Sequence, residues 1–321
     1  MIIYRLEINN YKSIINVELK YPNRFLAFVG ANSVGKSNIF EALEFAKIIL
    51  TSKDNALSLF GGIKEISSRN SQKAFRFVLE SISDSSLIDS IEIEYYDTPK
   101  GASFGTKGQN FEKFSVFIKN FSRIFIGHPE YVKLPFKDEK ALSLDCSNLE
   151  KVLGRLLKDN ALREEILDWL LTLIPEFRDI EIRQNELTGE ETLLVYEKND
   201  GEPFSGKLIS DGTKNILSLL SVVLQQDEPQ FICIEEPENG LNPKVIKEIV
   251  NFFREKCKEK GHYIWLTTHS QTLVSSLNQD EIIIVDKVNG ETQAKNIDEI
   301  NLHGLKLDEA WLSNILGGIP W

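Results

Sequence analysis

The sequence predicts an α/β fold with a mixed central sheet flanked by helices. Residues 30–37 read GANSVGKS and fit the phosphate-binding loop pattern G-x-x-x-x-G-K-[ST]. They stand between an apolar strand pattern at 25–29 and a helical pattern at 38–50. A second apolar strand, 231–234, ends in two carboxylates, and a third, 262–267, is followed by His and Ser. Polar residues at the carboxyl ends of such strands mark the ligand-binding edge of an open α/β sheet.

Composition limits the possible classes of protein. The chain has 321 residues and is 42% hydrophobic, enough to bury the core of one or two domains. We expect one domain, 1–321, with an inserted α/β subdomain at 97–205. The net charge of −11 excludes a surface that is basic throughout. Three cysteines match no zinc spacing, no apolar run has transmembrane length and the N-terminus lacks a signal-peptide pattern. These features predict a cytoplasmic protein without a membrane partner.

The N-terminal residues predict an antiparallel subdomain ahead of the phosphate loop. Residues 2–8 and 14–20 alternate between apolar and polar side chains, which is typical of two strands of a hairpin. Lys12 and Ser13 lie in the turn and could approach the base or ribose of a nucleotide. The alternative is an ordinary hairpin turn, and spacing alone favours that interpretation.

The phosphate loop has a clear physical basis. Gly30 and Gly35 let the backbone turn its N–H groups inward, and the positive end of the helix dipole points at the same place. Lys36 can reach the β and γ phosphates, and the Ser37 hydroxyl can ligate Mg²⁺. The other nucleotide-binding candidates of this segment are Asn32, Ser33 and Asn38. A chance surface turn is the alternative, and the strand–loop–helix context argues against it.

The middle of the chain carries weaker signals. Strand patterns at 74–80 and 91–96 precede a polar, glycine-rich stretch, 97–110, which we expect to be a loop or an insertion boundary. Apolar residues in 111–121 follow helical spacing. Residues 100–140 carry eight Lys/Arg against four Asp/Glu, which would suit a nucleic-acid or partner surface. The alternative is an amphipathic helix with its lysines in water, and the helical register favours it.

Further along, the patterns predict regular elements again. We expect a short strand at 123–127, one or two helices within 148–173, and a strand pair at 179–184 and 192–197. No heptad run is sustained, so a long coiled coil is excluded.

The second half of the chain completes the predicted site. Glu235 would hold Mg²⁺, and Glu236 would orient or deprotonate the attacking water. Because neighbouring side chains of a strand point to opposite faces, the two acids should act separately. His269 follows the strand 262–267 and could bond the γ-phosphate. Ser210 and Gly212 precede a helical pattern and could form an anion site at its N-terminus.

In this order, the motifs resemble those of the RecF/SMC-like group of ABC-type ATPases, a subgroup of P-loop NTPases, and especially the stand-alone, OLD-like AAA ATPases of prokaryotes. GANSVGKS resembles Walker A, and FICIEE (231–236) resembles Walker B, with Glu235 where Asp is commoner. ISDGT (209–213) resembles the ABC signature, ENGLNP (238–243) the D-loop and TTHS (267–270) the switch-histidine segment. The resemblance covers residues 1–80 and 205–321. Gln72 is a weak candidate for the Q-loop glutamine.

The resemblance implies an ATPase that uses ATP and Mg²⁺. Two protomers would sandwich two ATP molecules head to tail, so that Ser210 and Gly212 of one touch the γ-phosphate held by Lys36 of the other. OLD proteins carry a Toprim nuclease domain, for which the residues after 307 leave no room, so we expect a separate nuclease or toxin as effector. The leading hypothesis is an ATP-driven switch in phage defence or DNA maintenance. The alternatives are a DNA-repair ATPase that binds duplex DNA through 100–140, and a transporter subunit.

Overall fold

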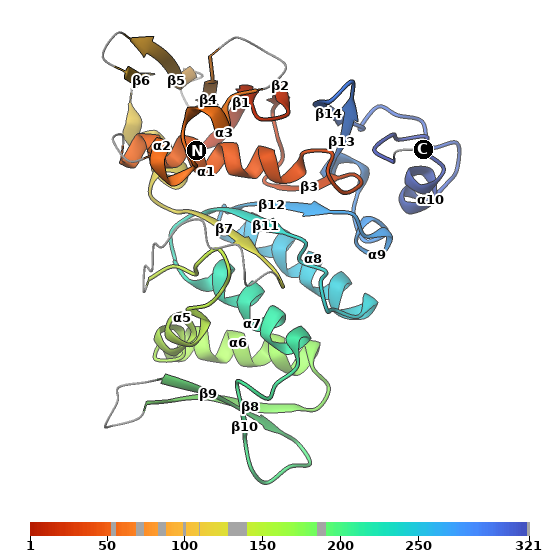
Figure 1. Ribbon diagram of the computed structural model, residues 1–321. Helices are drawn as coiled ribbons and strands as arrows, with labels where there is room; N and C mark the ends of the chain where they lie inside the picture. The colour runs from red at the N-terminus through yellow and green to blue at the C-terminus, as the bar shows by residue number, and fades with distance from the viewer. Residues whose placement is uncertain are drawn as a thin grey trace.

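A computed structural model describes most of the chain: residues 1–52, 56–68, 74–82, 88–98, 101–108, 110–127, 140–184 and 191–319. The described part contains an 11-stranded sheet (Figure 1). Its strands, in spatial order, are β6 (Gly101–Gly108), β5 (Ile88–Thr98), β4 (Arg76–Ile82), β1 (Ile2–Tyr11), β2 (Ile14–Lys20), β14 (Glu291–Asn296), β13 (Ile282–Val288), β3 (Phe25–Val29), β12 (Tyr263–Thr268), β11 (Phe231–Glu235) and β7 (Phe121–Phe125).

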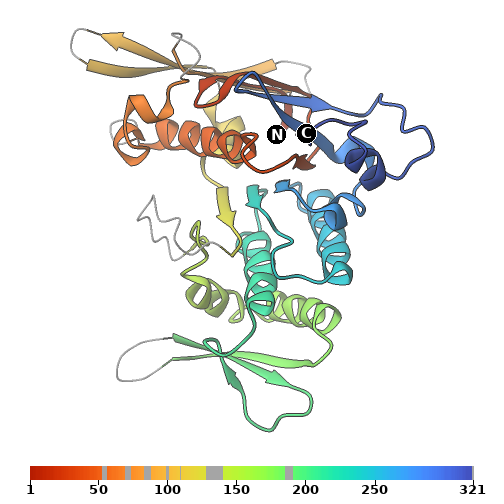
Figure 2. The ribbon, with the colours of Figure 1, turned by 45° about the vertical axis from the view of Figure 1, so that its right-hand side comes forward.

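The strands from β13 to β7 form a parallel half-sheet that is covered on both faces. Helix α1 (Lys36–Thr51) lies on one side, and α7 (Asp211–Leu224) and α8 (Pro243–Glu259) lie on the other (Figures 1 and 2). Alternate residues of β3 enter two separate cores: Ala27 packs with the α7 and α8 residues, and Phe28 packs with those of α1. Burial on both faces explains why these strands read as unbroken apolar runs.

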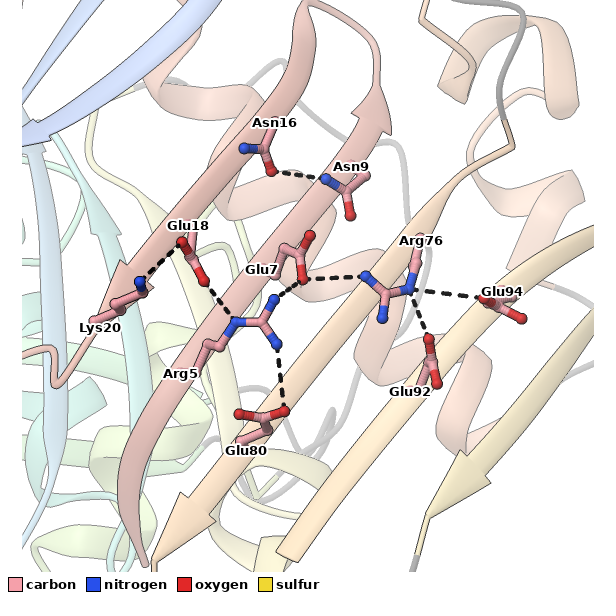
Figure 3. Close-up of polar contacts among 10 residues, drawn as sticks. All are labelled: Arg5, Glu7, Asn9, Asn16, Glu18, Lys20, Arg76, Glu80, Glu92 and Glu94. Carbon is pink, nitrogen blue, oxygen red and sulfur yellow. Dashed lines mark hydrogen bonds and ion pairs between the residues drawn. The ribbon is translucent and has the colours of Figure 1, made fainter. Parts of the chain in front are cut away.

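The other half-sheet is antiparallel and has one polar face. β6, β5, β4, β1 and β2 pair antiparallel in that order, and β2 meets β14 at the parallel pair Ile14–Thr292. On the polar face Arg5 contacts Glu7, Glu18 and Glu80, and Arg76 contacts Glu7, Glu92 and Glu94 (Figure 3). Each arginine therefore links carboxylates on neighbouring strands, the arrangement that stabilises a sheet through cross-strand pairs.

A smaller layer lies beyond α7. It comprises α5 (Leu149–Leu156), α6 (Asn160–Leu173) and a three-stranded sheet of β8 (Phe177–Gln184), β9 (Glu191–Glu197) and β10 (Phe204–Ser205) (Figure 2). The Asp159 carboxylate caps α6 by accepting from two backbone N–H groups. The short elements of the fold are α2 (Ala56–Leu59), α3 (Ile63–Ile66), η1 (Phe111–Phe114), α4 (Ser115–Ile118), α9 (Gln271–Val274), η2 (Gln279–Glu281) and α10 (Leu307–Leu312).

The predicted fold class, with its mixed sheet and N-terminal antiparallel strands, is confirmed. Two local predictions are wrong. The glycine-rich stretch expected to be a loop forms β6, which pairs along β5, because a neighbouring strand satisfies its backbone groups. The helix expected over 111–121 is only η1 and α4, and the chain has entered β7 by Phe121, whose pairing with β11 overrides the local helical spacing.

Within the expected 97–205 insertion, β6 and β7 are strands of the main sheet, whereas α5, α6, β8, β9 and β10 form the smaller layer. Gln72 lies outside the described residues. Within the described ranges, the helices are too short or too polar to cross a membrane.

Candidate nucleotide-binding site

The phosphate loop is built where only glycine fits. Gly35 has a φ of +105°, and a Cβ there would stand 2.0 Å from Oγ1 of Thr292. A Cβ on Gly30 would stand 2.2 Å from the carbonyl oxygen of Val285. The loop is therefore pressed against β13 and β14, with its glycines at the points of closest approach.

The side chain of Lys36 folds back onto the start of this loop. Its Nζ donates to the carbonyl oxygens of Gly30 and Ala31, each at 2.7 Å, and the side chain is buried. Burial lowers the pKa of Lys36 to about 8, while the nearby carboxylates of Glu236, Glu238 and Glu235 act in the opposite direction. An ammonium group held in a phosphate loop by two backbone carbonyls is well placed to bind phosphate.

Ser37 and Glu235 form the candidate metal site. The Ser37 hydroxyl donates to Oε2 of Glu235, whose side chain is buried at the end of β11. Hydroxyl and carboxylate oxygens are ligands that Mg²⁺ prefers, so the donor set fits this ion. The described part of the chain holds no group of three His, Cys, Asp or Glu side chains placed to bind a metal.

Glu236 follows β11 in a left-handed backbone conformation, with a φ of +52°. Its Oε1 lies 3.3 Å from Nδ1 of His269, and its Oε2 accepts from Nδ2 of Asn239 at 3.1 Å. Glu236 also lines a pocket of about 280 Å³ together with Thr267 and the phosphate-loop residues Asn32, Ser33, Gly35, Lys36, Ser37 and Asn38. The two acids of the Walker B pair thus have separate partners.

Glu238 and Thr268 contact each other beside the pocket and were not predicted individually, although they lie in the D-loop-like and switch-histidine segments. The Thr268 hydroxyl donates to Oε1 of Glu238 and accepts from the backbone N–H of Ser270 at 3.0 Å. Oε2 of Glu238 is buried and has no hydrogen-bond partner among the described residues, and burial raises the pKa of this carboxyl. The available signal was a third glutamate only two residues after the Walker B pair.

Ser210 and Gly212 lie at the start of α7, outside the Lys36 pocket. Ser210 is exposed, and its Oγ caps the helix by accepting from the backbone N–H of Thr213 at 3.1 Å. A Cβ on Gly212 would stand 2.6 Å from the carbonyl oxygen of Gly240, so this segment packs closely on the D-loop-like segment of the same chain. Neither residue lines the pocket that contains Lys36.

The turn residues Lys12 and Ser13 already have partners. Nζ of Lys12 donates to both carboxylate oxygens of Glu41 on α1, at 2.6 and 2.5 Å. Oγ of Ser13 lies 2.7 Å from Oγ1 of Thr292 and accepts from Nδ2 of Asn38 at 2.7 Å. These contacts join the turn to α1 and β14 beside the phosphate loop, which is the behaviour expected of an ordinary structural turn.

The comparisons with known proteins identify the family. A family model described as "AAA domain, putative AbiEii toxin, Type IV TA system" matches residues 25–275. The chain belongs to this AAA domain family. It is therefore an AAA-type ATPase, and the five motifs all lie within the matched residues.

Other similarities agree at the level of fold. The chain is 22% identical to an ATP/GTP phosphatase of Helicobacter pylori, over 86% of this chain and 88% of that protein. A stretch of 46 residues is 44% identical to a DNA double-strand break repair Rad50 ATPase of Methanocaldococcus jannaschii, covering 14% of this chain and 5% of that protein. The chain spans less than half the length of the transporter ATP-binding proteins it matches. A crystal structure of an SmcHead bound to the C-winged helix domain of ScpA has a TM-score of 0.63 at 17% identity, covering 97% of this chain and 100% of that one.

Proposed function

We propose that the protein is a Mg²⁺-dependent, ATP-driven switch that dimerises head to tail around ATP and controls a partner. One observation carries the proposal. Lys36, Ser37, Glu235 and Glu236 meet in one half-site, whereas Ser210, on the exposed tip of α7, lies outside that pocket. A second copy of the chain could bring its Ser210 and Gly212 to the half-site.

Each residue has a distinct chemical role in this scheme. The loop amides and Lys36 bind the phosphates, and Ser37 and Glu235 hold the metal, which when bound neutralises charge on the phosphates. Glu236 accepts a proton from the attacking water, and its contact with Asn239 orients it. His269 lies against Glu236 and is half exposed, so it can respond to the loss of the γ-phosphate.

The partner is proposed from the family rather than from the site. The family description names a toxin and a toxin–antitoxin system, which supports phage defence, with DNA maintenance as the other role. A separately encoded nuclease or toxin as the effector is proposed from the resemblance to OLD-like ATPases. Direct DNA binding through residues 100–140 has less support. Lys107 and Lys113 pair with Glu94 and Asp89, and Arg123 is buried.

The dimer is tested by measuring mass in solution with Mg-ATP. Glu236→Gln should bind ATP, hydrolyse it at least about a hundredfold more slowly and accumulate as a dimer. Adding Ser210→Arg to this variant should abolish the dimer and leave monomer ATP binding intact, because a long cation would replace the small group expected at the interface. A dimer that persists with Ser210→Arg contradicts the head-to-tail arrangement.

The partner is tested with tagged Glu236→Gln purified from its own host in Mg-ATP. A stoichiometric nuclease or toxin-like protein supports the switch. Duplex DNA without such a protein, together with DNA-stimulated ATP turnover, supports the DNA-repair alternative instead. A co-purifying membrane permease supports the transporter alternative.

A further inference from the structure

Arg123 is a buried charge beside the metal site, on a strand that none of the ATPase motifs includes. It lies on β7, and its side chain is 8% exposed. Nε and Nη2 both donate to Oε1 of Glu235, at 2.8 and 2.5 Å. Nη1 donates to Oε2 of Glu44 at 2.8 Å. A single guanidinium therefore holds carboxylates from β11 and from α1.

The two oxygens of Glu235 have different partners. Oε1 receives both N–H groups of Arg123, whereas Oε2 receives the hydroxyl of Ser37. Two donors from one rigid fork fix the position of Oε1, and the Ser37 hydroxyl holds Oε2, so the two contacts together set the plane of the carboxylate. Arg123 therefore turns one defined oxygen toward Ser37, the other candidate metal ligand.

This restraint matters because residue 235 is Glu. Compared with Asp, a glutamate carboxylate is one methylene farther from the backbone and has one more rotatable bond. A freely rotating carboxylate would have to be immobilised each time metal binds. The contact with Arg123 removes that freedom in advance.

The second carboxylate anchors the arginine. Glu44 lies on α1, the helix that begins with Lys36 and Ser37, and it is largely buried. Burial raises the pKa of Glu44, and the Arg123 guanidinium opposes this shift. The triad of one positive and two negative side chains therefore connects β7, β11 and the phosphate-loop helix.

We propose that Arg123 is a positioning residue that presents Oε2 of Glu235 to the divalent metal bound with ATP. The inference rests on the proposed Mg²⁺-dependent function. It adds to the site a residue that acts through Glu235 without touching the nucleotide.

The test measures the Mn²⁺ affinity of the ADP-loaded protein by electron paramagnetic resonance, alongside ADP affinity without metal. Arg123→Lys keeps the charge but loses the fork, so Mn²⁺ affinity should fall by about 10-fold or more, as for other outer partners of metal ligands. The affinity of Arg123→Lys for ADP without metal should stay within about twofold of the wild-type value. The matched control is Arg163→Lys, whose wild-type arginine pairs with Asp179 at the surface, and it should change neither value.

A second comparison separates positioning from a general loss of packing. In a Glu235→Gln background, Arg123→Lys should cause no further loss of Mn²⁺ affinity, because the group through which it acts is already removed. If Arg123→Lys does not fold, Glu44→Gln, which weakens one anchor of the guanidinium, should reduce Mn²⁺ affinity in the same direction.

The possible failures are distinguishable. If wild-type protein binds ADP no better with metal than without it, the proposed Mg²⁺-dependent function fails. If wild-type protein binds Mn²⁺ with ADP and folded Arg123→Lys or Glu44→Gln binds it equally well, only the role of Arg123 is overturned. The role of Arg123 is also overturned if Arg123→Lys lowers Mn²⁺ affinity by the same factor in the Glu235→Gln background as in the wild-type background.

Discussion

His262 should make the stability of the fold depend on pH between 4 and 6.5. It is buried directly before β12, the strand that ends at Thr268, and its Nδ1 accepts from the backbone N–H of Gln230 at 3.0 Å. Burial lowers the pKa of His262 to about 4, and the charges of Lys260, Lys256 and Arg24 act in the same direction. The folded protein therefore holds this imidazole neutral.

The sign and size of the effect follow from linkage. Between pH 6.5 and 4 the unfolded chain binds a proton at His262 that the folded chain does not, so the free energy of unfolding falls as the pH is lowered. With pKa values of about 4 folded and about 6.5 unfolded, the loss is about 2 kcal/mol between pH 7 and pH 5, and about 3 kcal/mol in full.

Urea unfolding at pH 7 and pH 5 measures this loss. His262→Gln keeps an oxygen that can accept from Gln230 and removes the titration, so its loss between the two pH values should be smaller by about 2 kcal/mol. His303→Asn, at an exposed left-handed position that Asn tolerates, is the matched control and should retain the wild-type loss. Equal losses for wild type and His262→Gln would refute the reasoning.

Two further changes test the site and the helix beside it. Lys36→Ala removes the buried ammonium that faces the phosphates and should weaken ATP binding by about 10- to 100-fold, measured by calorimetry; undiminished affinity would contradict the phosphate-loop assignment. Asn242→Ala removes the cap whose side chain accepts from the backbone N–H of Val245 at 3.0 Å, and should lower the free energy of unfolding by about 1 kcal/mol in urea; an unchanged midpoint would mean that solvent satisfies this helix end equally well.

Patterns within short stretches of sequence were enough to predict the buried parallel strands, the phosphate loop and α8. The phosphate loop, the buried strands β3, β11 and β12, and α8 with its Asn242 cap and Pro243 all depend on interactions within a few residues of the chain. Periodicity and capping chemistry act over that range, so the sequence reveals them. The pairing of Ser37 with Glu235 also followed, because strands of one parallel sheet present their carboxyl ends at one edge.

Pairing between distant segments decided the rest. The glycine-rich residues 101–108 form a strand because they pair with β5. Phe121 lies in a strand instead of the predicted helix because β7 pairs with β11. The sequence alone left two interpretations of Lys12 and Ser13, contact with a nucleotide or an ordinary hairpin turn. In the structure Nζ of Lys12 donates to the Glu41 carboxylate. By its sequence Arg123 was one more basic residue in a lysine-rich stretch. Only the tertiary structure places its guanidinium between Glu44 and Glu235, because hydrogen bonds across 79 and 112 residues leave no local signal.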